Sequence, residues 1–231
     1  MENLFLHYMF EKARREEEEI ITEFGPVITL SREYGCYGSE IAQLLADKIN
    51  HAKVYTEERD RWVFVSHQVL HDASTNMGTE PRDISHIFGA EEKSFFGDLV
   101  SLFSKDKYIS DSHIKRTIAR VVRSYSEQGK SIIVGRAGCV IAKHIEKAIH
   151  VKLIAPFEWR VSRIMERFSI SHAEAESKVK ETDKRRETFM KFFRGKKPDS
   201  ELFDLILNRS TLSNEDIVNI IYFFAQNRGL V

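Results

Sequence analysis

Residues 31–39, SREYGCYGS, have the composition of a loop that could bind phosphate. They follow a β-branched run at 27–30 and precede a segment with helical apolar spacing, so the order is strand, glycine loop, helix. Glycines let successive backbone N–H groups curl around phosphate oxygens, and the helix start adds positive potential. Two glycines in a turn are a weak signal alone, because a plain strand-to-helix turn also fits them. The loop predicts nucleotide-phosphate binding by Gly35, Cys36, Tyr37, Gly38 and Ser39.

Arginines form a second set of candidate anion ligands. Gly135-Arg136 follows another β-branched run, at 131–134, so we expect the Arg136 guanidinium beside the loop, where planar bidentate donors suit phosphate. A structural arginine paired with a carboxylate is the alternative. Arg160, Arg163 and Arg167 repeat at helical spacing, which is typical of a solvated face opposite an apolar stripe. Of these three, Arg163 is the candidate contact to a donor nucleotide.

Residues 178–197 are the most basic stretch of a chain in which 35 Lys+Arg balance 35 Asp+Glu. That balance predicts no attraction of the whole chain to nucleic acid or an anionic membrane, so anion binding must come from local clusters. In phosphoryl transfer, arginines that close over the site stabilise the charge on the transferring group. A basic helix for RNA or acidic partners is the alternative, but it leaves the glycine loop unexplained.

The elements that must position these residues alternate between strand and helix. Strands are expected at residues 27–30, 52–55, 131–134, 149–154 and 203–207. Helices are expected at 40–48, at 157–168, after the capping box of Ser171 and Glu174, and from Ser213 to Gln226. The pattern predicts an α/β fold with a five-stranded parallel sheet, helices on both faces, and ligands at the carboxyl ends of the strands.

Two segments fit this pattern less well. Residues 3–23 look helical and end in a dense charged run, so residues 1–25 are expected to form a solvated helical appendage, with a homodimer contact as the alternative. Residues 56–112 show no clear period and are assigned to a substrate-side insertion. No stretch approaches the roughly 20 apolar residues that cross a bilayer, and the N-terminus does not read as a secretory signal.

The chain has two cysteines, Cys36 and Cys139, so a disulfide framework is not expected to hold the fold. Each follows a strand expected to neighbour the other. Two buried small hydrophobic residues are the favoured interpretation, and a close redox pair is the alternative. Cytoplasmic localisation is expected.

Five blocks in order resemble the cytidylate kinase-like family: ITLSREYGCYGSEIAQLLADKI, VGRAGCVI, APFEWRVSRI, DKRRETFMKFFRGKK and FDLILNRSTLSNEDIV. Their order across residues 27–224 is far more specific than any one block. The resemblance implies a P-loop nucleoside monophosphate kinase fold at 26–231, with a nucleotide-monophosphate subdomain at 56–112 and a helical lid at 169–200.

The chain departs from the phosphate loop of ordinary cytidylate kinases at several positions. Laid on its G-x-x-x-x-G-K-G-T pattern, the first glycine becomes Arg32, the glycine before the lysine becomes Tyr37 and the lysine becomes Gly38. The lysine loss is shared with the family that the chain resembles. Removing such a charge weakens transition-state stabilisation, and Arg32 is the candidate substitute. Glu40 adds an unfavourable negative charge at the helix start.

The resemblance implies ATP-dependent phosphorylation of CMP or dCMP, with ATP and Mg²⁺ as cofactors and a nucleotide as the small-molecule partner. Arg136 would hold the acceptor, and Ser39 could hold magnesium. The remaining roles are transition-state stabilisation by Arg32 and Arg186, orientation of Arg186 by Asp183, and lid contacts to the donor by Arg163 and Arg185. Two other hypotheses stay open: a nucleotide-binding regulatory protein without catalysis, and a kinase for a small non-nucleotide acceptor.

Overall fold

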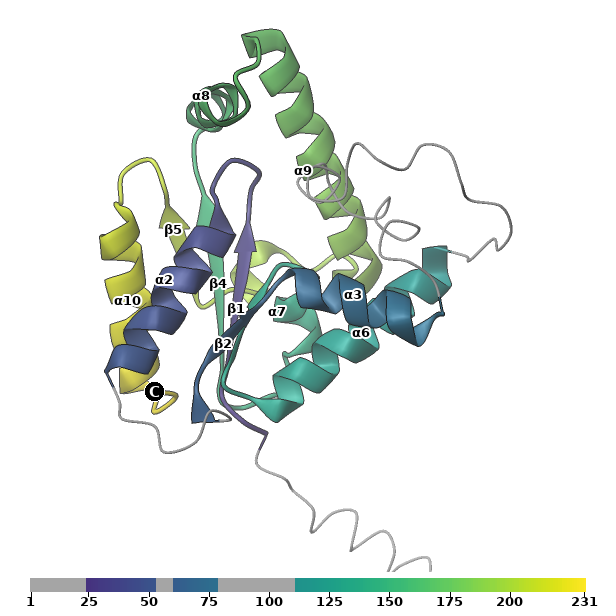
Figure 1. Ribbon diagram of the computed structural model, residues 1–231, viewed down its shortest axis with the longest axis vertical. Helices are drawn as coiled ribbons and strands as arrows, with labels where there is room; N and C mark the ends of the chain where they lie inside the picture. The colour runs from purple at the N-terminus through teal and green to yellow at the C-terminus, as the bar shows by residue number, and fades with distance from the viewer. Residues whose placement is uncertain (1–23, 53–59, 79–110) are drawn as a thin grey trace, which may run out of the picture.

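The computed structural model describes residues 24–52, 60–78 and 111–231 (Figure 1). Five strands form one sheet in the order β2-β3-β1-β4-β5, and all neighbouring strands are parallel. The strands are β1 Val27–Arg32, β2 Val63–Val65, β3 Ser131–Val134, β4 Ala148–Ile154 and β5 Leu205–Asn208. The predicted five-stranded parallel sheet is confirmed.

The central strand β1 is buried along its length because neighbours pair with it on both edges and helices cover both faces. Its side chains Val27, Ile28 and Leu30 are fully enclosed. A strand of this kind reads as a continuous apolar run instead of an alternating one. This is why the sequence located β1 and β3 without ambiguity.

Helices cover both faces of the sheet (Figure 1). One face carries α2 and α10, which share a core with β1, β3 and β4. The other carries α3, α6 and α7, with Phe189 of α9 completing that second core. The bounds are α2 Gly38–His51, α3 His67–Asn76, α6 Asp111–Gln128, α7 Gly138–Ile141, α8 Phe157–Phe168, α9 His172–Arg194 and α10 Asn214–Asn227.

Capping residues begin two of these helices where the sequence predicts. Ser171 accepts a hydrogen bond from the N–H of Glu174, whose carboxylate accepts from the Ser171 N–H, and this capping box begins α9. Ser213 and Asp216 form the same arrangement at α10. After α9, the 3₁₀ turn η3, Asp199–Glu201, leads into β5.

The second strand differs from the expectation. Ala52 caps the end of α2, and the rest of the strand predicted at 52–55 lies outside the described residues. The edge strand next to β3 is β2, which lies within the stretch that the sequence pattern assigned to the insertion. Three residues, VFV, are too short to show a period, and pairing with β3 decides their structure. The predicted N-terminal helix and residues 79–110 also lie outside the described residues.

Among the helices of the described ranges, none is both long enough and apolar enough to span a bilayer.

Candidate functional site

The loop between β1 and α2 stands at the carboxyl edge of the sheet (Figure 1). Glu33 N–H still bonds to Leu153 across the sheet, and the chain then turns through Gly35 at φ +91°. A Cβ on Gly35 would lie 3.0 Å from Arg160 Cβ and 3.1 Å from the Arg160 carbonyl oxygen. Both the backbone angle and the close approach of α8 therefore call for glycine here.

Tyr37 ends the loop in the left-handed conformation, at φ 47° and ψ 50°, immediately before α2 begins at Gly38. This conformation is unfavourable for a residue with a Cβ, by about 1–2 kcal/mol. Three contacts hold it. The Tyr37 hydroxyl donates to the Arg163 carbonyl oxygen at 2.8 Å, and the Arg167 guanidinium lies 4.5 Å from the ring centroid. The ring also packs with Tyr34 in a small core between α8 and α9.

Four amides of the loop have no acceptor in the described part of the protein. They are the backbone N–H groups of Gly35, Tyr37, Gly38 and Ser39. The last two open α2, where the helix dipole adds positive potential. Loops of this form bind phosphate oxygens through successive N–H groups. The loop can therefore hold a phosphate.

Arg160 ties the loop to both α8 and α9. Its guanidinium lies 3.3 Å from the Glu33 carboxylate, forms an ion pair with Asp183, and donates to the Tyr34 carbonyl at 3.1 Å. Only 7% of Arg160 is exposed. The expectation that it shares a solvated face with Arg163 and Arg167 is therefore wrong for Arg160, because carboxylates from two other elements draw it inward.

Arg32 occupies the opposite side of the loop. Its aliphatic stem lies against Gly38, where an added Cβ would come within 3.2 Å of Arg32 Cγ and Cδ. Its guanidinium lies against Gly135, where an added Cβ would overlap Arg32 Nη1. The two glycines thus make room for one arginine across the carboxyl ends of β1 and β3.

Arg136 and Arg186 reach the same region. Arg136 is buried in the turn after β3, next to Gly135. From α9, Arg186 Nη1 donates to the Arg32 carbonyl oxygen at 3.4 Å, and the Arg186 guanidinium lies 5.3 Å from the Tyr34 ring centroid. Arg32 and Arg186 therefore meet at one edge of the loop, and Arg136 is the next residue in the chain after the Gly135 that Arg32 contacts.

A model of the cytidylate kinase-like family matches residues 27–211, which is most of the chain and includes every element that builds this edge. The chain belongs to the cytidylate kinase-like family. The P-loop kinase fold predicted from the sequence is confirmed by this match together with the parallel sheet and its strand-loop-helix start.

Two solved structures are similar to this family member, and the first of them resembles it in fold. An uncharacterized protein from Eubacterium ventriosum has a TM-score of 0.60 at 18% identity, over 87% of this chain and 98% of that one. A shikimate kinase from Acinetobacter baumannii, in complex with shikimate, has a TM-score of 0.48 at 15% identity, over 90% and 97%.

One curated protein, a uronate isomerase from Corynebacterium glutamicum, is 29% identical over 91 residues. Those residues make up 39% of this chain, which spans only 18% of that protein.

Other predicted site residues of this cytidylate kinase-like chain have these partners. Asp183 accepts from the Tyr34 N–H at 2.8 Å and from Arg160, so its orientation of Arg186 stays a prediction. Arg163 pairs with Glu166 at 3.2 Å, and Arg185 pairs with Glu181 one turn before it. Both ion pairs are largely exposed, and such pairs contribute little to stability. Neither prevents its arginine from turning toward a ligand.

Ser39 lies half-buried in the first turn of α2, where the magnesium site was predicted. The neighbouring Glu40 carboxylate lies 3.1 Å from Arg167, so the negative charge expected to oppose phosphate binding is paired. Within the described ranges, no group of three or more acidic, histidine or cysteine side chains is placed to hold a metal ion.

The two cysteines are buried and free. Burial raises the pKa of Cys36 to about 12 and that of Cys139 to about 11, so both thiols stay protonated at neutral pH. Cys139 Sγ lies 3.8 Å from the Ser31 hydroxyl. Both cysteines serve as small buried side chains, which was the favoured interpretation.

Arg209 was missed by the sequence analysis. It follows β5, is 7% exposed, and donates from Nε to the Cys36 carbonyl oxygen at 3.2 Å. The available signal was a cation directly after a parallel strand, since the carboxyl ends of such strands meet at one edge.

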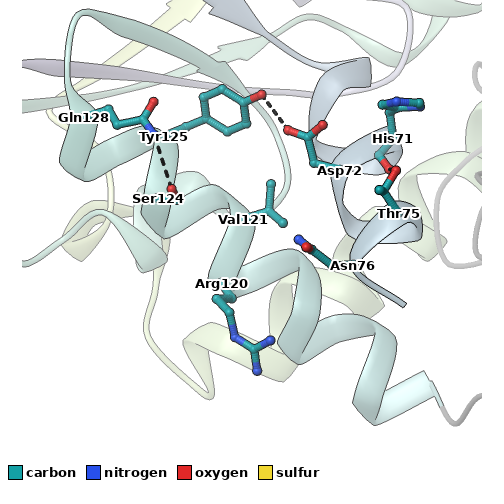
Figure 2. A pocket seen from close by; sticks show the side chains of 9 residues that line it. All are labelled: His71, Asp72, Thr75, Asn76, Arg120, Val121, Ser124, Tyr125 and Gln128. Carbon is teal, nitrogen blue, oxygen red and sulfur yellow. Dashed lines mark hydrogen bonds between the residues drawn. The ribbon is translucent and has the colours of Figure 1, made fainter. Parts of the chain in front are cut away.

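A separate groove of about 530 Å³ lies between α3 and α6 (Figure 2). Tyr125 and Asp72 point toward one another across it and hydrogen bond at 2.6 Å, which contributes with burial to raising the pKa of Tyr125 to about 12. No residue of the phosphate loop lines this groove. The phosphate loop of this cytidylate kinase-like chain therefore remains the candidate site.

Proposed function

We propose that this protein transfers a phosphoryl group from ATP to a nucleoside monophosphate, with CMP or dCMP as the first acceptor to test. The observation that carries the proposal is the group of four loop amides without a protein acceptor beside two arginines, Arg32 and Arg186, that meet at one edge of the loop. Family membership supports the same class of reaction. The acceptor is proposed from the family alone, since no described residue is tied to cytosine.

The amides of Gly35 to Ser39 would bind the donor phosphates. Arg136, in the turn after β3, would hold the acceptor phosphate through its planar guanidinium. Arg186, reaching in from α9, would stabilise charge on the transferring group. Arg163 and Arg185 would contact the donor from the lid, after breaking exposed ion pairs that contribute little.

Arg32 is proposed to replace the missing P-loop lysine. The reason is spatial: its stem covers Gly38, the position aligned with that lysine, and its guanidinium lies over the Gly135 turn. With this replacement, one positive charge stays between the loop amides, which would bind the donor, and the turn after β3, which would bind the acceptor. Such a charge acts mainly in the transition state.

Magnesium fits the site in part. The Ser39 hydroxyl would supply one protein ligand to a nucleotide-bound Mg²⁺, since Mg²⁺ commonly completes its shell with phosphate oxygens and water. Bound there, it would neutralise phosphate charge. Glu40 is held by Arg167 and would supply a ligand only if that pair opened.

The test is an ADP-release assay with ATP, Mg²⁺ and each of CMP, dCMP, UMP and AMP. The proposal predicts turnover with at least one pyrimidine monophosphate and faster turnover with CMP or dCMP than with AMP. Absence of turnover with all four would refute it as a nucleotide kinase. Shikimate and other small hydroxyl acceptors in the same assay test the alternative acceptor class.

A second candidate function is nucleotide binding without catalysis. The observation in its favour is that Tyr34, Tyr37 and Arg160 connect α8 and α9 to the loop through buried contacts. Catalysis in enzymes of this kind commonly requires the lid to move, and these contacts would restrict that motion and slow turnover. Calorimetric binding of ATP together with zero ADP release would favour this regulatory role.

A further inference from the structure

We propose that Arg209 is a positioning residue of the phosphate loop, which aims a loop amide at the donor phosphate and supplies a buried positive charge behind it. The proposal rests on the proposed function, because it assigns a further residue to the same site. It concerns binding of the polyphosphate part of the donor, independently of which acceptor is used.

The position of Arg209 is fixed by the sheet. Its backbone N–H bonds to the Ile154 carbonyl at 2.8 Å, which extends the pairing of β5 with β4. From there the side chain crosses to the loop, where Nε donates to the Cys36 carbonyl oxygen. With 7% of the residue exposed, most of the Arg209 side chain is covered.

The bond to Cys36 determines where the next amide points. In a trans peptide the C=O and the following N–H point in opposite directions, and the described chain has no cis peptide. Because the Cys36 carbonyl faces Arg209, the Tyr37 N–H points away from Arg209. Arg160 has the same effect two residues earlier in the loop. It donates to the Tyr34 carbonyl, so the Gly35 N–H points away from Arg160.

The two arginines differ in their counter-charges. Arg160 is neutralised by Glu33 and Asp183. In the described part of the chain, no carboxylate lies within ion-pair distance of Arg209, and its Nη1 and Nη2 have no acceptor.

The surroundings of Arg209 leave its charge under-compensated. Burial lowers the pKa of Arg209, Cys36 and then Glu40 oppose that shift, and Arg163 adds repulsion. The Glu40 carboxylate makes its own ion pair with Arg167. A buried charge is unfavourable unless it is paired. A polyphosphate held by the Tyr37 amide, across the same peptide unit, would provide the missing negative charge.

The hydrogen bond adds to this effect. A guanidinium on the Cys36 carbonyl polarises that peptide unit, so its N–H becomes a stronger donor to a phosphate oxygen. Arg209 thus acts through the loop and not by touching the ligand. Arg209 would thus supply part of the positive charge that the missing lysine no longer provides, from the side of the loop opposite the phosphate.

The experiment measures binding of tripolyphosphate and of ATP to the full chain by calorimetry, with thermal unfolding in parallel. The variants are Arg209→Gln, which keeps a donor for Cys36 but removes the charge, and Arg209→Met, which removes both. The control for the loss of one positive charge is Arg228→Met, because Arg228 caps the end of α10.

We expect Arg209→Gln to weaken tripolyphosphate binding about 10-fold through loss of the charge, and Arg209→Met about 10- to 100-fold through loss of both the charge and the hydrogen bond to Cys36. For Arg209→Gln the ligand-free unfolding temperature should change little, while the rise in that temperature on adding tripolyphosphate should shrink. Arg228→Met should match the wild type. A merely structural arginine would lower the ligand-free temperature and leave the ligand-induced rise unchanged.

Three outcomes overturn the inference. If both Arg209 variants bind tripolyphosphate within 2-fold of wild type, Arg209 is not a positioning residue, although the proposed function stands. If Arg209→Met does not fold and Arg209→Gln binds normally, the residue is structural. If the wild type binds neither tripolyphosphate nor ATP, the proposed function fails and this inference fails with it.

Discussion

The two sides of the phosphate loop are built differently. On the side of α8 and α9, which we propose as the lid side, large side chains and buried ion pairs hold the loop. Tyr34 and Tyr37 enter the small core between α8 and α9, and Arg160 joins three elements. On the side of β3, the loop meets one long side chain, Arg32, laid against Gly38 and Gly135. The first side determines the backbone conformation of the loop, and the second determines where charge is placed.

This division explains how the loop tolerates its departures from the common pattern. Tyr37 stands where glycine would adopt the left-handed conformation without strain, and contacts on the lid side hold it there. The lysine is absent, and Arg32 fills the space on the other side. Changes on the lid side should therefore alter stability, and changes on the β3 side should alter turnover.

The largest effect is expected for Arg160→Met. Removing this guanidinium leaves the Glu33 and Asp183 carboxylates without their partner in a mostly buried setting. Breaking one partner of such a network costs about 3–5 kcal/mol of unfolding free energy. Urea unfolding followed by far-UV circular dichroism measures it.

The double variant Arg160→Met/Asp183→Asn provides the control. Because it removes one of the charges that Arg160 neutralises, it should recover part of the loss. Equal stability of wild type and Arg160→Met would show that the lid side does not hold the loop.

A medium effect is expected for Gly135→Ala, on turnover. The new methyl group overlaps Arg32 Nη1 and displaces the guanidinium. Loss of a group that stabilises the transition state lowers kcat about 10- to 100-fold. Steady-state kinetics at saturating ATP measures the change.

Gly229→Ala is the matched control for backbone strain. Gly229 has φ +68°, close to the +74° of Gly135, but a Cβ there meets nothing within 4 Å. Both variants should lose about 1 kcal/mol of stability, and only Gly135→Ala should lose turnover. Equal kcat in the two variants would show that displacing the Arg32 guanidinium from Gly135 does not affect turnover.

The smallest effect is expected for Tyr37→Phe. The change removes one hydroxyl, which donates to the Arg163 carbonyl, and leaves the ring under Arg167 in place. Loss of one hydrogen bond of this kind costs about 1 kcal/mol. Thermal unfolding measures the loss, and unchanged ATP affinity in the same variant would show that the bond acts on the lid alone.

Local signals were enough to predict most of the fold. The buried run of β1, the glycine loop and α2 follow one another in sequence, so neighbouring residues carry the pattern. Capping boxes fixed the starts of α9 and α10 for the same reason. The arginine and glycine of the β3 turn were found because they directly follow an apolar strand.

Long-range contacts determine what could not be predicted. The strand β2 is three residues long and becomes a strand through pairing with β3. The burial of Arg160 depends on Asp183, 23 residues further along the chain, and the Arg209 bond to Cys36 joins residues 173 apart. Helical spacing alone places Arg160 on a solvated face, so no local pattern could reveal these partners.

The central claim is that Arg32 replaces the P-loop lysine, and the Arg32→Ala variant tests it most directly. Turnover and calorimetric ATP affinity are measured on the same preparation. The account predicts that kcat falls about 100-fold while the Kd for ATP changes only a few-fold, because a contact made mainly in the transition state lowers kcat. The double variant Arg32→Ala/Gly38→Lys, in which the arginine stem no longer crowds residue 38, should regain part of the lost turnover. Unchanged kcat in Arg32→Ala, together with increased kcat in Gly38→Lys alone, would contradict the account.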